Sequence, residues 1–67
     1  MKISERYDYM VRVEYDDGHE ETWHFDDEDD ARDYAYDMVQ ELGVIGAELC
    51  LMDWYMHQDI SLDYIEP

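Results

Sequence analysis

The sequence predicts an α+β fold, in which a single antiparallel sheet of three to four strands carries one helix packed on one face. Two patterns predict it. Apolar and polar residues alternate over residues 6–15, which is the period of a half-buried strand, and apolar residues recur at helical spacing from Ala31 onward. A chain of 67 residues has room for one core, so residues 1–67 are expected to form a single domain. The expected order is strand, strand, helix, strand, strand.

The first two strands are expected to form a hairpin around Gly18. The first strand places Tyr and Val side chains on one face, and residues 20–25 resume a strand pattern. A two-residue turn would set Val11 opposite His24 and leave the apolar residues of the two strands on opposite faces. A three-residue loop, with Gly18 in the left-handed conformation that glycine adopts without strain, sets Val11 opposite Trp23 instead. We predict the three-residue loop because it unites the apolar residues.

The helix is predicted over residues 27–42. Asp26 or Asp27 can cap its N-terminus, and the acidic residues that follow suit the first turn, where the helix dipole favours negative charge. Gly43 is expected to end the helix as the residue directly after it. The apolar stripe that would face the sheet is Ala31, Tyr34, Ala35, Met38 and Leu42.

The second half of the chain is dense in apolar residues. Residues 47–56 suit a central strand covered on both faces, but apolar residues also recur there at helical spacing, so strand and helix both stay open. Gln58 and Asp59 are expected to form a turn. Residues 60–65 then alternate as a short terminal strand.

Charge sets this chain apart. It has 20 Asp and Glu against 4 Lys and Arg, a net charge of −16, while 46% of its residues are hydrophobic. Disordered acidic segments lack such apolar content, so we expect a folded domain. Like charge at this density opposes compaction and is compatible with a basic partner. The same charge repels nucleic acid and anionic lipid, so direct binding to either is not expected.

The sequence gives no sign of export or of membrane insertion. Residues 1–4 begin no apolar run that could form a signal peptide, and no apolar stretch is long enough to span a membrane. Cys50 is the only cysteine, which fits a reducing compartment. We therefore expect a cytoplasmic protein.

We expect neither a metal, nor a cofactor, nor enzymatic activity. The acidic clusters lack the order of ligands found in EF-hand loops, and His19, His24 and His57 do not have the HExxH spacing. A single Cys excludes a zinc site built on cysteines. Cys50 lies in an apolar run, where a buried structural thiol is expected.

One side of the predicted helix is acidic. Asp30, Asp33, Asp37 and Glu41 lie opposite the apolar stripe, three, four and four residues apart. At a rise of ~1.5 Å per residue the carboxylates follow one another every ~4.5–6 Å, against one phosphate every ~3.4 Å along a DNA strand. Solvated faces ordinarily intersperse Lys and Arg with the acids, and Arg32 is the one basic residue of this helix. The pattern favours a partner-facing surface over plain solvation or adaptation to high salt.

Aromatic and Met residues are expected mostly in the core, with two exceptions. Tyr36 falls on the acidic side of the helix. Met52, Trp54 and Met56 share one strand parity, so they either include an exposed anchor or homodimer seam, or are buried by the terminal strand. The residues expected to contact a partner are Asp16, Asp17, Glu20, Glu21, Asp29, Asp30, Asp33, Tyr36, Asp37, Glu41 and Trp54.

A short, acidic, aromatic-rich chain with an acid-lined helix resembles the small phage-encoded inhibitors that imitate nucleic acid. These include anti-CRISPR proteins, anti-restriction proteins and uracil-DNA glycosylase inhibitors. The resemblance rests on size, charge and the helix, so no binding residue is carried over from it. It implies that the chain is a DNA mimic that occupies the basic groove of a nucleic-acid-binding protein or ribonucleoprotein complex in a bacterial host. A CRISPR effector is the favoured target, because its guide and target channels are long and positively charged.

Two other functions remain open on the sequence. An immunity protein or antitoxin resembling barstar would block a basic nuclease with the same physics. A housekeeping domain from a halophile would explain the depletion of Lys, but seven Tyr and five Met are not what salt adaptation requires.

Overall fold

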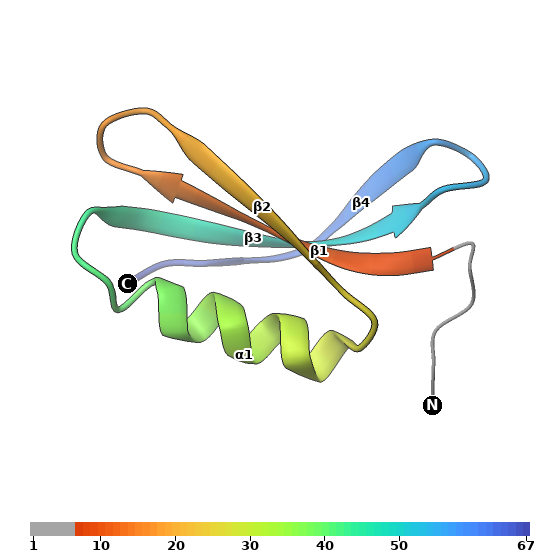
Figure 1. The fold of residues 1–67 in the computed structure, drawn as a ribbon, viewed down its shortest axis with the longest axis horizontal. Coiled ribbons are helices and arrows are strands. Elements are labelled where there is room, and N and C mark those ends of the chain that lie inside the picture. The colour runs from red at the N-terminus through yellow and green to blue at the C-terminus, as the bar shows by residue number, and fades with distance from the viewer. Residues whose placement is uncertain (1–6) are drawn as a thin grey trace.

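The structure, a computed structural model, describes residues 7–67. Four strands form one antiparallel sheet in the spatial order β2-β1-β3-β4, and one helix lies across one of its faces (Figure 1). This confirms the predicted α+β fold and its order of elements. Arg6, expected in the first strand, lies outside the described residues. The elements are β1 (Tyr7–Tyr15), β2 (Glu20–Phe25), α1 (Glu28–Met38), β3 (Val44–Asp53) and β4 (Gln58–Ile65).

The hairpin of β1 and β2 has the predicted register. Val11 pairs with Trp23, and the backbone N–H of Tyr15 donates to the carbonyl of His19 at 3.0 Å, which closes a three-residue loop. Gly18 has a φ of +94°, a conformation in which a side chain would be strained. The position of the glycine therefore selected this loop over the two-residue turn.

The helix begins as predicted but ends earlier. The Asp27 side chain caps α1 by accepting a hydrogen bond from a backbone N–H of the first turn. The predicted end at Leu42 is wrong, because the helix stops at Met38 and the backbone then tightens into turns. Val39 turns into the core in place of Leu42, which is fully exposed. α1 has no basic residue in its last turn. No positive side chain there interacts favourably with the negative end of the helix dipole, which would otherwise stabilise the C-terminal end of the helix.

Gly43 ends the link between α1 and β3, and not the helix itself as predicted. Its φ is +88°, so it takes the left-handed conformation, but several residues after the helix has ended. Its carbonyl accepts a hydrogen bond from the backbone N–H of Asp16 at 2.7 Å. This bond joins the link to the loop between β1 and β2, at the C-terminal end of the helix.

Residues 47–56 are resolved as strand followed by turn. β3 continues to Asp53, residues 54–57 form the turn, and β4 begins at Gln58. The predicted turn at Gln58 and Asp59 is therefore wrong. The Asp53 carboxylate closes the chain earlier, since its Oδ1 accepts from the backbone N–H groups of Tyr55 (3.1 Å) and Met56 (3.2 Å).

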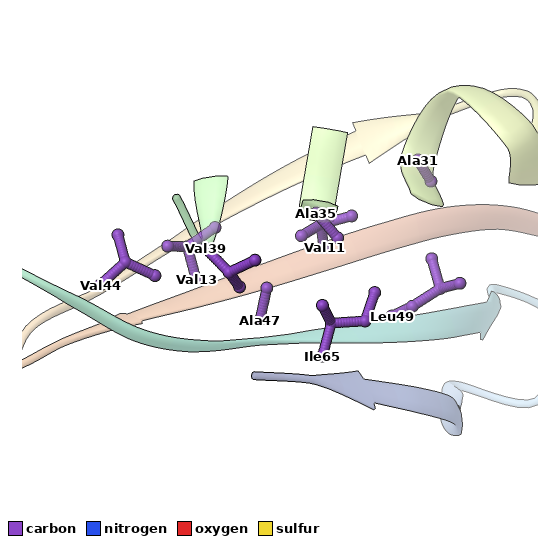
Figure 2. Packing of buried hydrophobic residues seen from close by; sticks show 9 residues of the cluster. All are labelled: Val11, Val13, Ala31, Ala35, Val39, Val44, Ala47, Leu49 and Ile65. Carbon is purple, nitrogen blue, oxygen red and sulfur yellow. The ribbon is translucent and has the colours of Figure 1, made fainter. Parts of the chain in front are cut away.

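The core lies between α1 and the face of the sheet that it covers (Figure 2). Small side chains at Ala31 and Ala35 of α1 and at Ala47 of β3 allow the helix to pack closely on the sheet. The side of α1 that faces away from the sheet is left in solvent. The buried cluster consists of Val11, Val13, Ala31, Ala35, Val39, Val44, Ala47, Leu49 and Ile65.

No helix of residues 7–67 covers the opposite face of the sheet, which we call the open face. Met10 and Cys50 on this face are nevertheless buried. Polar side chains of the sheet surround them, and the Arg12 guanidinium donates to Glu48 Oε1 at 2.7 Å. Burial raises the pKa of the Cys50 thiol to about 11, with a further contribution from the Glu48 carboxylate. Cys50 is thus a buried structural thiol, as predicted.

Candidate protein-binding surface

The acidic side of α1 is the strongest candidate for a binding surface. Asp29, Asp30, Asp33 and Asp37 are all exposed, and we call these four residues the helix acids. Within residues 7–67 none of their carboxylates makes an ion pair or a side-chain hydrogen bond. Four charges held on one rigid helix are therefore free to meet a partner.

The one basic residue of the helix does not neutralise them. Arg32 donates to Glu28 Oε2 and to Asp63 Oδ2, each at 2.9 Å. Asp63 belongs to β4, so the guanidinium is drawn to the flank of the helix nearest that strand. These hydrogen bonds, first to Glu28 and then to Asp63, raise the pKa of Arg32. The charge of Arg32 is therefore paired with Glu28 and Asp63 and not with the helix acids.

The row of acids continues beyond the helix onto the loop between β1 and β2. The backbone hydrogen bond from Asp16 to Gly43 fixes this loop beside the C-terminal end of α1. Tyr15, the last residue of β1, lies beside this loop, and its hydroxyl donates a hydrogen bond to Glu21 Oε1 at 2.9 Å. The pKa of Tyr15 is raised mainly by this hydrogen bond, and to a lesser extent by burial and by nearby charges that include Glu21 and Glu41. Asp16, Glu21 and Glu41 thus gather at one end of the helix acids.

Two of the predicted acids do not join this row. Asp17 is held within its own loop, where its Oδ1 lies 2.6 Å from the Nδ1 of His19. The hydrogen bonds from His19, the backbone one first, lower the pKa of Asp17. Glu20 belongs to the open face, with its Oε1 3.9 Å from the Nε of Arg12.

The two predicted aromatic anchors lie in different places. Tyr36 is half exposed on α1, among the helix acids, as predicted. Trp54 is also half exposed, but its ring lies 5.8 Å from that of His24. His24 Nδ1 is 3.1 Å from Asp8 Oδ2, and both side chains lie on the open face. Trp54 therefore does not share a surface with the helix acids.

Trp23 is the residue that the sequence did not indicate. Its pairing with Val11 places it on the helix-covered face, where we expected it to be buried, yet it is 52% exposed. The cause is the breadth of the sheet, since α1 packs mainly against β1 and β3, and β2 is an edge strand. The signal in the sequence was the ratio of one helix to four strands, which leaves an edge strand uncovered.

The open face carries a second acidic group, but a paired one. Glu48, Asp59 and Glu20 surround Arg12, with the nearest nitrogen–oxygen distances at 2.7, 3.6 and 3.9 Å. The Arg12 guanidinium therefore partly neutralises their negative charge. Among residues 7–67 no three His, Cys, Asp or Glu side chains are grouped so that they could hold a metal ion.

In the part of the chain that the structure describes, no helix has the length and apolar character needed to cross a membrane. No protein-family model matches the chain, and searches of the curated proteins and of the solved structures return no match. Chemically the surface offers a row of carboxylates on α1 that no basic side chain of the described residues pairs with, and exposed aromatic rings lie beside it.

Proposed function

We propose that this protein is an inhibitor that imitates nucleic acid and occupies the basic DNA- or RNA-binding groove of a nucleic-acid-handling enzyme. One observation carries the proposal: the helix acids are exposed and have no ion-pair partner among residues 7–67, while Arg32 of the same helix is held by Glu28 and Asp63. A basic groove would supply the positive charge that the fold does not.

The spacing of the charges supports this reading. The 11 residues of α1 span ~16 Å. Along it Asp30, Asp33 and Asp37 follow one another every ~4.5–6 Å, with Asp29 directly before Asp30, against ~3.4 Å between phosphates of one DNA strand. Asp16, Glu21 and Glu41 extend the row at the C-terminal end of the helix. The line of charge is thus long enough to displace several phosphates from a groove.

A CRISPR effector is the target class that we favour, in keeping with the resemblance to phage-encoded inhibitors. Its channels hold nucleic acid through the backbone in a positively charged path, so a protein with a matching line of charge competes for them without base recognition. Such an inhibitor acts in the cytoplasm of a bacterial host. Charge complementarity predicts fast association that slows with added salt.

Affinity capture from a bacterial lysate followed by a competition assay tests the proposal. The immobilised wild-type protein is compared with Asp33→Lys/Asp37→Lys, which reverses two helix acids. Glu20→Lys/Glu66→Lys is the matched control, because it makes the same change in net charge at exposed positions away from the row. Captured proteins are identified by mass spectrometry, and the purified target is then tested for binding of its DNA or RNA in the presence of each variant.

We expect the wild type and the control to retain the target and to displace its nucleic acid, and the helix variant to lose both properties. A target that binds its nucleic acid undisturbed in the presence of the inhibitor contradicts the mimic. Equal affinity of the helix variant and the control contradicts the assignment of the surface to α1.

A further inference from the structure

We propose that the surface between α1 and β2 binds arginine side chains of the partner, and that a guanidinium stacks on the exposed ring of Trp23. This inference rests on the proposed function and names the chemistry by which the partner is recognised. Acidic charge alone would attract Lys and Arg equally. The aromatic ring beside the acids is what distinguishes between them.

Trp23 is a rigid and accessible ring. It lies on β2, whose pairing with β1 holds it opposite the buried Val11. Tyr34 of α1 approaches it with a centroid distance of 6.2 Å and a tilt of 60°, and the ring of Phe25 lies 5.3 Å from that of Tyr34. These contacts hold the indole from one side, while about half of its surface stays in solvent. A tryptophan offers a large contact area and loses little conformational freedom on binding, because its side chain has only two χ angles.

Carboxylates flank the aromatic group. Asp30 and Asp37 lie one turn before and one turn after Tyr34 on α1, and Glu21 lies two residues before Trp23 on the same face of β2. Glu21 is near enough to the aromatic group to add to the effect of burial in raising the pKa of Tyr34. The aromatic rings thus have negative charge on the side of the helix and along the strand.

This combination suits arginine better than lysine. A guanidinium is planar, so it can stack on an indole face and still direct N–H groups to a carboxylate in the plane of the group. An ammonium group is a compact, strongly hydrated point charge and gains less from the ring. Trp54 is not an equivalent site, because its ring lies beside His24, which contacts Asp8 on the open face, while the helix acids lie on the other side of the sheet.

Two short peptides of equal length, oligoarginine and oligolysine, test the proposal without knowledge of the target. Their dissociation constants are measured for the wild type at one fixed ionic strength. Stacking at an exposed site predicts that the arginine peptide binds about two- to fivefold more tightly than the lysine peptide. Trp23→Leu should lose this preference and keep its affinity for the lysine peptide, whereas Trp54→Leu should keep the preference.

A second readout does not require Trp23 to be replaced. The chain has two Trp, so Trp54→Phe leaves Trp23 as the only source of tryptophan fluorescence. We expect its emission to change on titration with the arginine peptide and to change less with the lysine peptide. Equal binding of the two peptides to the wild type, or an unaltered Trp23 emission, overturns the proposal.

The two proposals can fail separately. An arginine preference that depends on Trp23, together with a target whose nucleic acid is not displaced, upholds the arginine surface and rejects the mimic. Displacement of the nucleic acid without any arginine preference upholds the mimic and rejects the role of Trp23.

Discussion

Tyr64 lies directly over Gly46 of the adjacent strand, and its hydroxyl donates a 2.7 Å hydrogen bond to Glu14 on the strand beyond. The ring thereby crosses from β4 over β3 to β1 on the open face. A Cβ atom at position 46 would overlap the phenol ring. The absence of a side chain at Gly46 is what allows the three strands to be joined in this way.

Gly46→Ala should therefore destabilise the fold. The added methyl group either displaces the Tyr64 ring, which breaks its bond to Glu14, or strains the strands, and overpacking of this kind costs about 1–3 kcal/mol. Urea unfolding measures the loss. Tyr64→Ala is the control background, since in it the methyl group at position 46 meets no ring and should cost much less. Equal costs in the two backgrounds would show that the ring does not limit position 46.

The hydrogen bond from Tyr64 also predicts how stability depends on pH. The bond to Glu14, and then burial and the nearby carboxylates, raise the pKa of Tyr64 to about 12, against ~10 for an unperturbed tyrosine. Because the pKa is raised in the folded state, the contribution of the neutral hydroxyl is complete below pH ~10 and is lost as the pH rises toward 12. Thermal unfolding across this range should show the loss.

Tyr64→Phe is the matched variant for that experiment. It lacks the ionising hydroxyl, so its stability should fall less steeply between pH ~10 and 12 than that of the wild type. A smaller decline should persist in it, because the pKa values of Tyr15 and Tyr34 are raised as well. Identical pH profiles for the two proteins would contradict the role given to the Tyr64 hydroxyl.

Because α1 ends at Met38, we expect Val39 to matter for stability and Leu42 not to. Val39→Ala removes apolar atoms from the core and should cost about 1–3 kcal/mol. Leu42→Ala removes a side chain that is fully exposed and should change stability by less than about 0.5 kcal/mol. Chemical denaturation of both variants checks the pair. A larger loss of stability for Leu42→Ala than for Val39→Ala would instead support the longer helix, to Leu42, that the apolar spacing predicted.

This pair of residues also shows where sequence reasoning reached its limit. The register of the first hairpin was predictable, because Gly18 and the apolar residues of both strands agree on one loop. The end of the helix was not, since Val39 and Leu42 are both apolar and adjacent on a helical projection. The choice between them depends on where the chain must turn to enter β3, which is a property of the assembled sheet.

Some features of the binding surface were likewise predictable from the sequence, and others depend on the assembled fold. The outward direction of the helix acids follows from helical periodicity alone. That Arg32 does not neutralise them depends on its partner Asp63, which is distant in the sequence and close only in the fold. The exposure of Trp23 and the placement of Trp54 on the open face likewise depend on which strands the helix covers, and neither could be predicted from local pattern.

The helix acids give a last prediction, on salt. With a net charge of −16 and both arginines of residues 7–67 held in ion pairs, repulsion among carboxylates should dominate the electrostatics of folding. Added salt shortens the Debye length from ~10 Å at 0.1 M to ~3 Å at 1 M, so the melting temperature should rise over this range. Asp33→Lys/Asp37→Lys relieves part of the repulsion and should show a higher melting temperature at low salt and a weaker dependence on salt. A wild-type melting temperature that falls steadily as NaCl is added would instead mean that the ion pairs of Arg12 and Arg32 outweigh the repulsion.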